Sequence, residues 1–536
     1  MANTGDTVFT YDVTLRDGAQ QKGINLSVAD KLALLPYLEK LGLDYIEGGW
    51  PGAIPRDTEF FEKVKESNPL TSARLVAFGS TRKAGLKAGE DRQVNALVES
   101  GAQVITLVAK SDIRHVEQAL KTTPEENLAM VRDTVTYLRN QGREVMIDAE
   151  HFFDGFAFDP DYTTSVVKAA FDAGATWVIL CDTNGGSLPD RITDIVTDLR
   201  TRLGKGPYNL GIHCHNDTGC AVANTIAAVN AGCRQIQGTI NGLGERTGNT
   251  NILTCIGNLA LKTNYQVATD EQLQQLSSVA YAVAEITNKA PSSRQPYVGQ
   301  TAFAHKAGLH ASAIRVDPDL YQHIDPARVG NDMRMIVSDM AGRASIELKA
   351  REFGIDLAGN SEVLTHATDA VKEAEAHGYT FDAAEASFEL LLREILAGAP
   401  IEYFTVESWS ASTHTAGVDT DTTFAEAIVK VHAGGQRIMR IGEGVGPVDA
   451  LDDALRTALE NVYPLLTEFK LVDFKVRILD SHKGTEATTR VMITVRDGRG
   501  AWTTVGVGSD VIEASWEALT RGYVYGLLRN EVTPAL

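Results

Sequence analysis

The chain has few cysteines for its length and no long apolar run. Its five cysteines, in 536 residues, show neither the spacing of a disulfide framework nor a Cys-x-x-Cys motif. No apolar run approaches the roughly 20 residues that cross a bilayer, and the first residues lack the basic and apolar regions of a signal peptide. These absences predict a reduced, cytoplasmic protein without a membrane-spanning segment.

Basic residues are also scarce relative to acidic ones. The chain has 50 lysines and arginines against 70 aspartates and glutamates, a formal net charge of −20. This balance disfavours nucleic acid or an anionic membrane surface as the main partner. It does not exclude a small anionic substrate, because a local site can be positive within an acidic protein. With 43% apolar residues, the chain is long enough for two to four domains.

Short apolar runs alternate with helix-period stretches along the first half of the chain. The eight predicted strands are Val8–Thr14, Asp44–Glu47, Arg74–Gly79, Val104–Lys110, Glu144–Glu150, Trp177–Thr183, Tyr208–His215 and Gln235–Asn241. Several predicted helices end at a glycine just before the next strand, as at Gly42 and Gly174. Eight strand–helix units predict a (β/α)8 TIM barrel over residues 1–265. The count and the length favour a barrel over an open, doubly wound sheet.

The strand–helix rhythm stops after the eighth unit. Helical patterns dominate residues 266–400, which we interpret as helical linker subdomains with an ordered functional segment. Residues 401–536 alternate in the β pattern, and residues 442–455 resemble residues 506–519 at an offset of 64. This repeat predicts a C-terminal α+β domain with an internal duplication. A small-ligand site at the junction and a purely structural duplication are about equally expected.

His213 and His215 stand at the end of the seventh predicted strand. Two residues apart on an extended chain, they point to the same face, where one divalent cation could take both. Such a pair alone more often reflects packing or a polar strand edge. In a barrel, however, this strand end lies on the catalytic rim, to which Asp17 and Asn249 also belong. This mixed oxygen and nitrogen set suits Mg²⁺, Mn²⁺ or Zn²⁺, whereas Cys214, in the opposite phase, should point out of the barrel.

Three further polar residues follow strand ends on the same rim. Arg16, beside Asp17, is suited to stabilising an oxyanion on a metal-bound carbonyl. Glu150 could orient a substrate or carry charge, and Thr183 could donate a hydrogen bond to a carboxylate. Polar groups that converge from nearly every strand on one rim indicate a ligand site, because clustered charge in a barrel mouth needs partners.

Four motifs resemble those of the α-isopropylmalate, homocitrate and citramalate synthase family, in the same order and spacing. They are Thr14-Leu-Arg-Asp-Gly-Ala-Gln20, His213-x-His-Asn-Asp217, Asn241-Gly-Leu-Gly-Glu-Arg-Thr-Gly-Asn249 and His305-Lys-Ala-Gly-Leu-His-Ala311. Three further stretches are most similar to the citramalate branch, namely residues 47–55, 148–155 and 181–186. In the isopropylmalate branch a valine usually follows the Asp-Thr pair, whereas this chain has Asn184.

The resemblance implies a Claisen-type condensation in which acetyl-CoA is the nucleophile and an α-keto acid is the electrophile. The acceptor implied by the citramalate branch is pyruvate. A divalent metal on Asp17, His213, His215 and Asn249 would hold the keto and carboxylate oxygens of the acceptor. Arg16 would then stabilise the alkoxide that forms.

The remaining implied roles belong to the linker and the C-terminal domain. His310 and Tyr321 match the histidine and tyrosine that remove the acetyl proton in related enzymes, and they could act across a homodimer. From the residues alone, a surface or capping role would be favoured for His305 and His310. The C-terminal domain resembles the family's feedback-inhibition module, whose implied effector is a branched-chain amino acid, isoleucine in the citramalate branch.

Other activities are also compatible with these residues. Isopropylmalate or homocitrate formation differs only in the acceptor, and one methylene in a pocket is worth about 1–3 kcal/mol. A CoA-thioester lyase could use the same barrel, although the linker motif around His310 and the C-terminal module favour a regulated synthase. A non-catalytic amino-acid sensor is disfavoured because the polar groups of the rim are all present.

Overall fold

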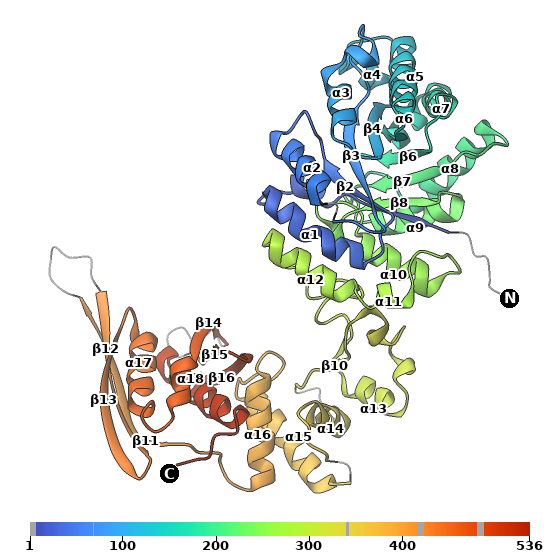
Figure 1. Cartoon of the computed structure of the whole chain (residues 1–536). Helices are drawn as coiled ribbons and strands as arrows, with labels where there is room; N and C mark the ends of the chain where they lie inside the picture. The colour runs from blue at the N-terminus through green and yellow to red at the C-terminus, as the bar shows by residue number, and fades with distance from the viewer. Residues whose placement is uncertain are drawn as a thin grey trace. The chain divides into compact units, whose positions relative to one another are not determined.

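The computed structural model describes residues 7–67, 69–338, 342–357, 359–415, 423–479 and 487–535. The chain forms two compact units (Figure 1). The first comprises Met1–Phe303 with Ile324–Asp332, and the second comprises Ala304–His323 with Met333–Leu536. Among the described residues, no helix has the length and apolar character to cross a membrane.

The first unit contains a closed barrel of eight parallel strands, β1 to β8 in sequence order (Figure 1). These are β1 (Phe9–Asp12), β2 (Tyr45–Gly49), β3 (Arg74–Ser80), β4 (Val104–Lys110), β5 (Glu144–Glu150), β6 (Trp177–Asp182), β7 (Leu210–Cys214) and β8 (Gln235–Gly238). Strand β1 closes the barrel against β8, with Phe9 opposite Gln235 and Asp12 opposite Gly238. The predicted TIM barrel is therefore confirmed, and each strand overlaps a predicted run.

Helices surround the barrel strands. They are α1 (Val28–Lys40), α2 (Pro55–Ser67), α3 (Arg92–Glu99), α4 (Ile113–Gln118), α5 (Pro124–Asn140), α6 (Phe152–Phe158), α7 (Pro160–Asp172), α8 (Pro189–Leu203), α9 (Ala221–Ala231), α10 (Ile252–Lys262), α11 (Asp270–Leu273) and α12 (Leu276–Thr287). Local sequence sets their ends: Ser27 and Asp30 form a capping box before α1. Gly42 and Gly174 follow helices with φ of 66° and 100°, a conformation that glycine adopts without strain.

The barrel buries two separate apolar layers. Inside the strands, large side chains such as Tyr11, Met146 and Trp177 fill the interior. Outside them, aliphatic side chains of the strands pack against the helices in a much larger core, which includes Cys214. The predicted outward phase of Cys214 is confirmed, so His213 and His215 belong to the opposite, inward phase of the chain.

The second unit begins with a helical segment. Its helices are α13 (Gly308–Val316), α14 (Arg343–Glu352), α15 (Ser361–Ala376) and α16 (Glu385–Ala397), and β9 (Ala304–His305) pairs in parallel with β10 (Arg334–Met335). The division of the chain at residues 265 and 400 stays a prediction.

Two β-β-β-α repeats complete the second unit. The first is β11 (Thr405–Thr415), β12 (Thr423–Ala433), β13 (Gln436–Gly444) and α17 (Pro447–Leu459), and the second is β14 (Lys470–Ile478), β15 (Thr489–Asp497), β16 (Gly500–Gly508) and α18 (Val511–Arg529). Each sheet is antiparallel, in sequence order. A Cβ at Gly442 or Gly506 would overlap the backbone of the following helix, α17 or α18 respectively. The repeated glycines thus allow close helix–sheet packing, and the predicted duplication is confirmed.

Candidate functional site

Asp17, His213 and His215 lie together at the C-terminal end of the barrel. Their ligand atoms are within 4.8 Å of one another, and all three side chains are buried. His213 belongs to β7, while the backbone of His215 pairs with that of Asn249 in an isolated bridge. The alternation along β7 and the loop after β1 therefore bring the three predicted ligands to one point.

A buried hydrogen-bond chain orients His213. Its Nδ1 lies 3.0 Å from Oε1 of Gln237, and Nε2 of Gln237 donates to Oδ1 of Asp148 at 3.2 Å. Because an amide oxygen can only accept, Nδ1 of His213 donates this hydrogen bond, and Nε2 is the ring nitrogen left to face a cation. That Nε2 lies 3.9 Å from Oδ2 of Asp17. Gln237 is not among the residues predicted from the sequence, although its inward phase on the eighth strand was a usable signal.

Asn249 lies against the same cluster. Its Nδ2 donates to Oδ1 of Asp17 and to the backbone oxygen of Leu243, both at 3.0 Å. Its Oδ1, like Nδ1 of His215, is buried without a hydrogen-bond partner among the described residues. Unpaired buried acceptors around a carboxylate and an imidazole fit a divalent cation, which would satisfy them.

The electrostatics of the cluster also suit a cation. Burial would raise the pKa of Asp17, but Arg16 and the two histidines lower it to about 2. Burial, followed by the neighbouring His213, lowers the pKa of His215 to about 4. At neutral pH the carboxylate is therefore charged and His215 is neutral, the protonation states that ligate metals.

Arg16 supplies a fixed positive charge beside these ligands. Its Nε pairs with Glu47, its Nη1 lies 3.2 Å from Oδ2 of Asp17, and its guanidinium lies 3.8 Å from the ring centroid of Phe78. Glu47 is fully buried and accepts a 2.7 Å hydrogen bond from the Tyr11 hydroxyl. Burial lowers the pKa of Arg16, but Glu47 and Asp17 outweigh burial and raise it.

These side chains border a cavity of about 300 Å³. Its lining comprises Arg16, Asp17, Gln20, Trp50, Phe78, Val108, Asp148, Glu150, Cys181, Thr183, His213, His215, Glu245 and Arg246. Glu150 forms an ion pair with Lys110. The Thr183 hydroxyl accepts a 2.8 Å hydrogen bond from the backbone nitrogen of His151. The cavity thus joins Glu150 and Thr183 to Arg16 and the three clustered ligands.

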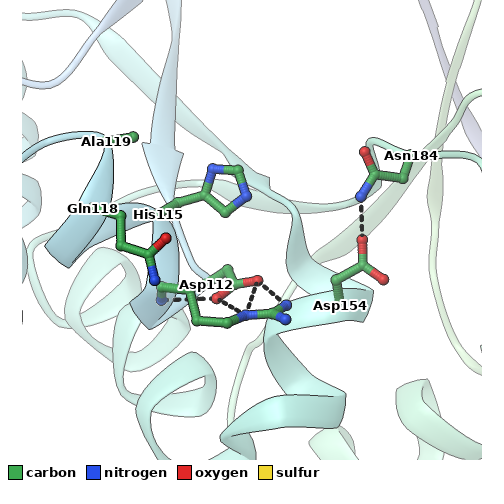
Figure 2. Close-up of a pocket in the computed structure, with 7 residues that line it drawn as sticks. Asp112, His115, Gln118, Ala119, Asp154 and Asn184 are labelled. Atoms are coloured by element: carbon green, nitrogen blue, oxygen red, sulfur yellow. Dashed lines mark hydrogen bonds and ion pairs between the residues drawn. The ribbon is translucent and has the colours of Figure 1, made fainter.

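A second hollow has a volume of about 550 Å³ and is lined in part by Asn184. The preceding residue, Thr183, lines the first cavity, so neighbouring residues of the chain border the two hollows. In Figure 2, Asn184 donates a 2.6 Å hydrogen bond to Asp154 across one side of the hollow. His115 borders it as well, and its ring stacks on that of His151 with centroids 3.9 Å apart. No sequence pattern predicted this hollow.

His310 and Tyr321 belong to the second unit. The two rings stack with centroids 4.1 Å apart and an interplanar angle of 30°, and His305 lies 6.0 Å from His310. Tyr321 is 41% exposed and the neighbouring Leu309 is 75% exposed. The predicted histidine and tyrosine are therefore side by side on an accessible surface of their own unit.

Three family models match the chain: HMGL-like over residues 7–283, homocitrate synthase post-HMGL domain-like over 297–378, and LeuA allosteric (dimerisation) domain over 382–527. The (R)-citramalate synthase of Streptomyces coelicolor is 57% identical over 99% of this chain and 98% of that protein. This chain belongs to the citramalate and 2-isopropylmalate synthase family. The (R)-citramalate synthase of Synechocystis is 45% identical over 98% of this chain and 97% of that protein.

Relatives named as 2-isopropylmalate synthases match this chain at lower identity than these two citramalate synthases. A probable 2-isopropylmalate synthase of Methanopyrus kandleri is 31% identical over 96% of this chain and 98% of its own length. The family predicted from the four motifs is confirmed. The similarity to the family also extends beyond the barrel, because the linker and C-terminal family models match the second half of the chain.

Replacing Gln237 with alanine should weaken divalent-cation binding by about 10–100-fold, because His213 would lose the partner that sets its tautomer. Titration calorimetry with Mn²⁺ measures the change. Gln235→Ala is the matched control, since Gln235 lies on the same strand but its amide contacts Met146 at 3.7 Å. Equal Mn²⁺ affinity in both variants would contradict the positioning role of Gln237.

Proposed function

We propose that this chain is a citramalate synthase, which condenses acetyl-CoA with pyruvate to give (R)-citramalate and CoA. The acetyl methyl carbon loses a proton to a base and bonds to the keto carbon of pyruvate. The keto oxygen becomes an alkoxide and takes up a proton, and water then hydrolyses the thioester and releases the CoA thiol. The Asp17, His213 and His215 cluster, facing a cavity beside Arg16, is the observation that carries this proposal.

The polar side of the cavity would bind the acceptor. Asp17, His213 and His215, with Asn249, would hold a divalent cation, which as a Lewis acid supplies polarisation of the keto group. Arg16 is already charged and fixed by Glu47, so it can donate to the developing alkoxide without reorganising. We assign Glu150 and Thr183 to orienting the substrate, Thr183 through its hydroxyl.

The acetyl proton would pass to a base in the second unit. We assign this base to His310, with Tyr321 stacked against its ring. The match to a LeuA dimerisation domain supports a homodimer, in which one subunit could provide this pair to the barrel of the other. Acetyl-CoA is too long to fit in the acceptor cavity alone. The hollow in Figure 2 is our candidate for part of the binding site of acetyl-CoA.

Purified protein should release free thiol from acetyl-CoA only when a divalent cation and an α-keto acid are both present. Among pyruvate, 2-ketobutyrate and 2-ketoisovalerate, pyruvate should give the highest kcat/KM, as followed with a thiol reagent. His213→Ala should abolish turnover, while its circular dichroism stays that of the wild type. A clear preference for 2-ketoisovalerate would replace this proposal with isopropylmalate synthesis, and thiol release with no acceptor dependence would refute a synthase.

Mixing two inactive variants tests whether the base acts across a dimer. His213→Ala and His310→Ala should each be inactive, but co-refolding equal amounts should restore about a quarter of wild-type activity. Half of the dimers would be hybrids, and each hybrid would hold one intact site of two. No recovery from verified hybrid dimers would place the base and the metal ligands of each site in one subunit.

We further propose that the C-terminal repeats form a regulatory site for isoleucine, the product expected downstream of citramalate. The match to the LeuA allosteric domain and the internal duplication support this role. Isoleucine should inhibit thiol release and give a binding heat by calorimetry. Absence of both heat and inhibition would leave the duplication without a regulatory function.

A further inference from the structure

One part of the acceptor cavity's lining is apolar, in contrast to the polar part that includes Arg16, Asp17 and the two histidines. Trp50, Phe78, Val108 and Cys181 supply the apolar lining. The indole of Trp50 packs edge to face against Phe78, with ring centroids 5.4 Å apart and an interplanar angle of 84°. Phe78 in turn carries the guanidinium of Arg16 on its face. The wall is therefore packed directly against a group that we assign to the reaction.

A buried ion pair holds the backbone that carries Trp50. Nζ of Lys31 lies 2.6 Å from Oδ1 of Asp57 and donates to the backbone oxygen of Gly48 at 2.8 Å. Oδ2 of Asp57 accepts a 2.8 Å hydrogen bond from the backbone nitrogen of Trp50. Lys31 and Asp57 are each 2% exposed. A buried ion pair with these further hydrogen bonds resists displacement, because moving one partner would leave the other charge buried without a partner.

The two glycines before Trp50 tighten the same turn. A Cβ at Gly48 would lie 2.5 Å from the ring of Phe60, and one at Gly49, where φ is 142°, would overlap the carboxylate of Asp57. The chain therefore passes too close to α2 for any other residue. Trp50 therefore lies at the cavity on a segment of the chain that has little freedom to move away from it.

We propose that Trp50 limits the size of the acceptor's side chain and so makes pyruvate the preferred α-keto acid. This inference rests on the proposed function. The keto and carboxylate oxygens of an acceptor would bind to a cation held by Asp17 and the two histidines, to Arg16 and to Thr183. This arrangement leaves the alkyl group of the acceptor for the apolar wall. The cavity, at about 300 Å³, is at the small end for ligand sites and must also admit the acetyl group.

A rigid wall discriminates by excluding volume, and one methylene changes kcat/KM by about 10–200-fold in such pockets. Trp50→Leu and Trp50→Met should therefore raise the kcat/KM ratio of 2-ketoisovalerate to pyruvate by about 10-fold or more. 2-Ketobutyrate should show a smaller rise. The KM for acetyl-CoA should change by less than about threefold in both variants, because the indole acts on the acceptor.

Two controls separate volume from other effects. Trp50→Phe keeps an aromatic ring but removes Nε1, which is buried without a hydrogen-bond partner among the described residues. Because phenylalanine fills more of the space than leucine does, this variant should shift the ratio less than Trp50→Leu. Trp177→Phe changes a tryptophan inside the barrel, 5.3 Å from Phe9 and absent from the cavity lining, and should leave the ratio unchanged.

Several outcomes would overturn the inference. An unchanged acceptor ratio in a folded, active Trp50→Leu or Trp50→Met variant would do so. A raised KM for acetyl-CoA with an unchanged ratio would assign Trp50 to the CoA side of the site. If Trp50→Phe shifted the ratio as much as Trp50→Leu, the loss of Nε1 and not the loss of volume would decide the preference. The wild-type enzyme tests the proposed function separately, because its acceptor preference is measured before any variant.

Discussion

The burial of charge at the mouth of the barrel is the constraint on which the site depends. Arg16, Asp17 and Glu47 are all shielded from water, and an unpaired charge there would cost several kcal/mol. Each charge has a partner: Glu47 and Asp17 flank Arg16, and Tyr11 donates to Glu47 from inside the barrel. Oδ1 of Asn249 and Nδ1 of His215 have no hydrogen-bond partner among the described residues, and a bound cation would satisfy such acceptors.

The barrel satisfies this constraint because it brings together partners from strands that are far apart in the sequence. Asp17 follows β1, His213 lies near the end of β7, and Asn249 follows β8, so the closed barrel alone brings them within reach of one another. Gln237 on β8 then links His213 to Asp148 on β5. The burial of Asp148 raises its pKa to about 8, so this carboxyl group is largely protonated at neutral pH and adds little charge to the site.

Much of the architecture could be predicted because it depends on local patterns. Strand phase placed Cys214 outside and the two histidines inside, and the likeness of residues 442–455 to residues 506–519 predicted the duplication of the C-terminal domain. Motif order was enough to identify the family. The same patterns say nothing of contacts set by distant neighbours. Gln237 looks like any polar strand residue until Asp148, 89 positions away, is beside it.

The wall of the cavity escaped prediction for the same reason. Trp50 stood within a motif that resembled the citramalate branch, but its packing on Phe78 needs the turn held by Lys31 and Asp57. A charged residue on the first helix and an acidic one on the second normally read as surface positions. Only the folded chain reveals them as a buried pair that bears on the acceptor cavity.

The Lewis-acid role proposed for this site requires that a divalent cation bind to Asp17 and the two histidines. Electron spin echo modulation of enzyme-bound Mn²⁺ can test this binding, because the method detects nitrogen nuclei bonded to the ion. One Mn²⁺ should bind per chain and show modulation from two imidazole nitrogens, reduced to one in a His215→Ala variant that still binds the ion. Tightly bound Mn²⁺ without nitrogen modulation would contradict it, as would no stoichiometric binding to the folded protein.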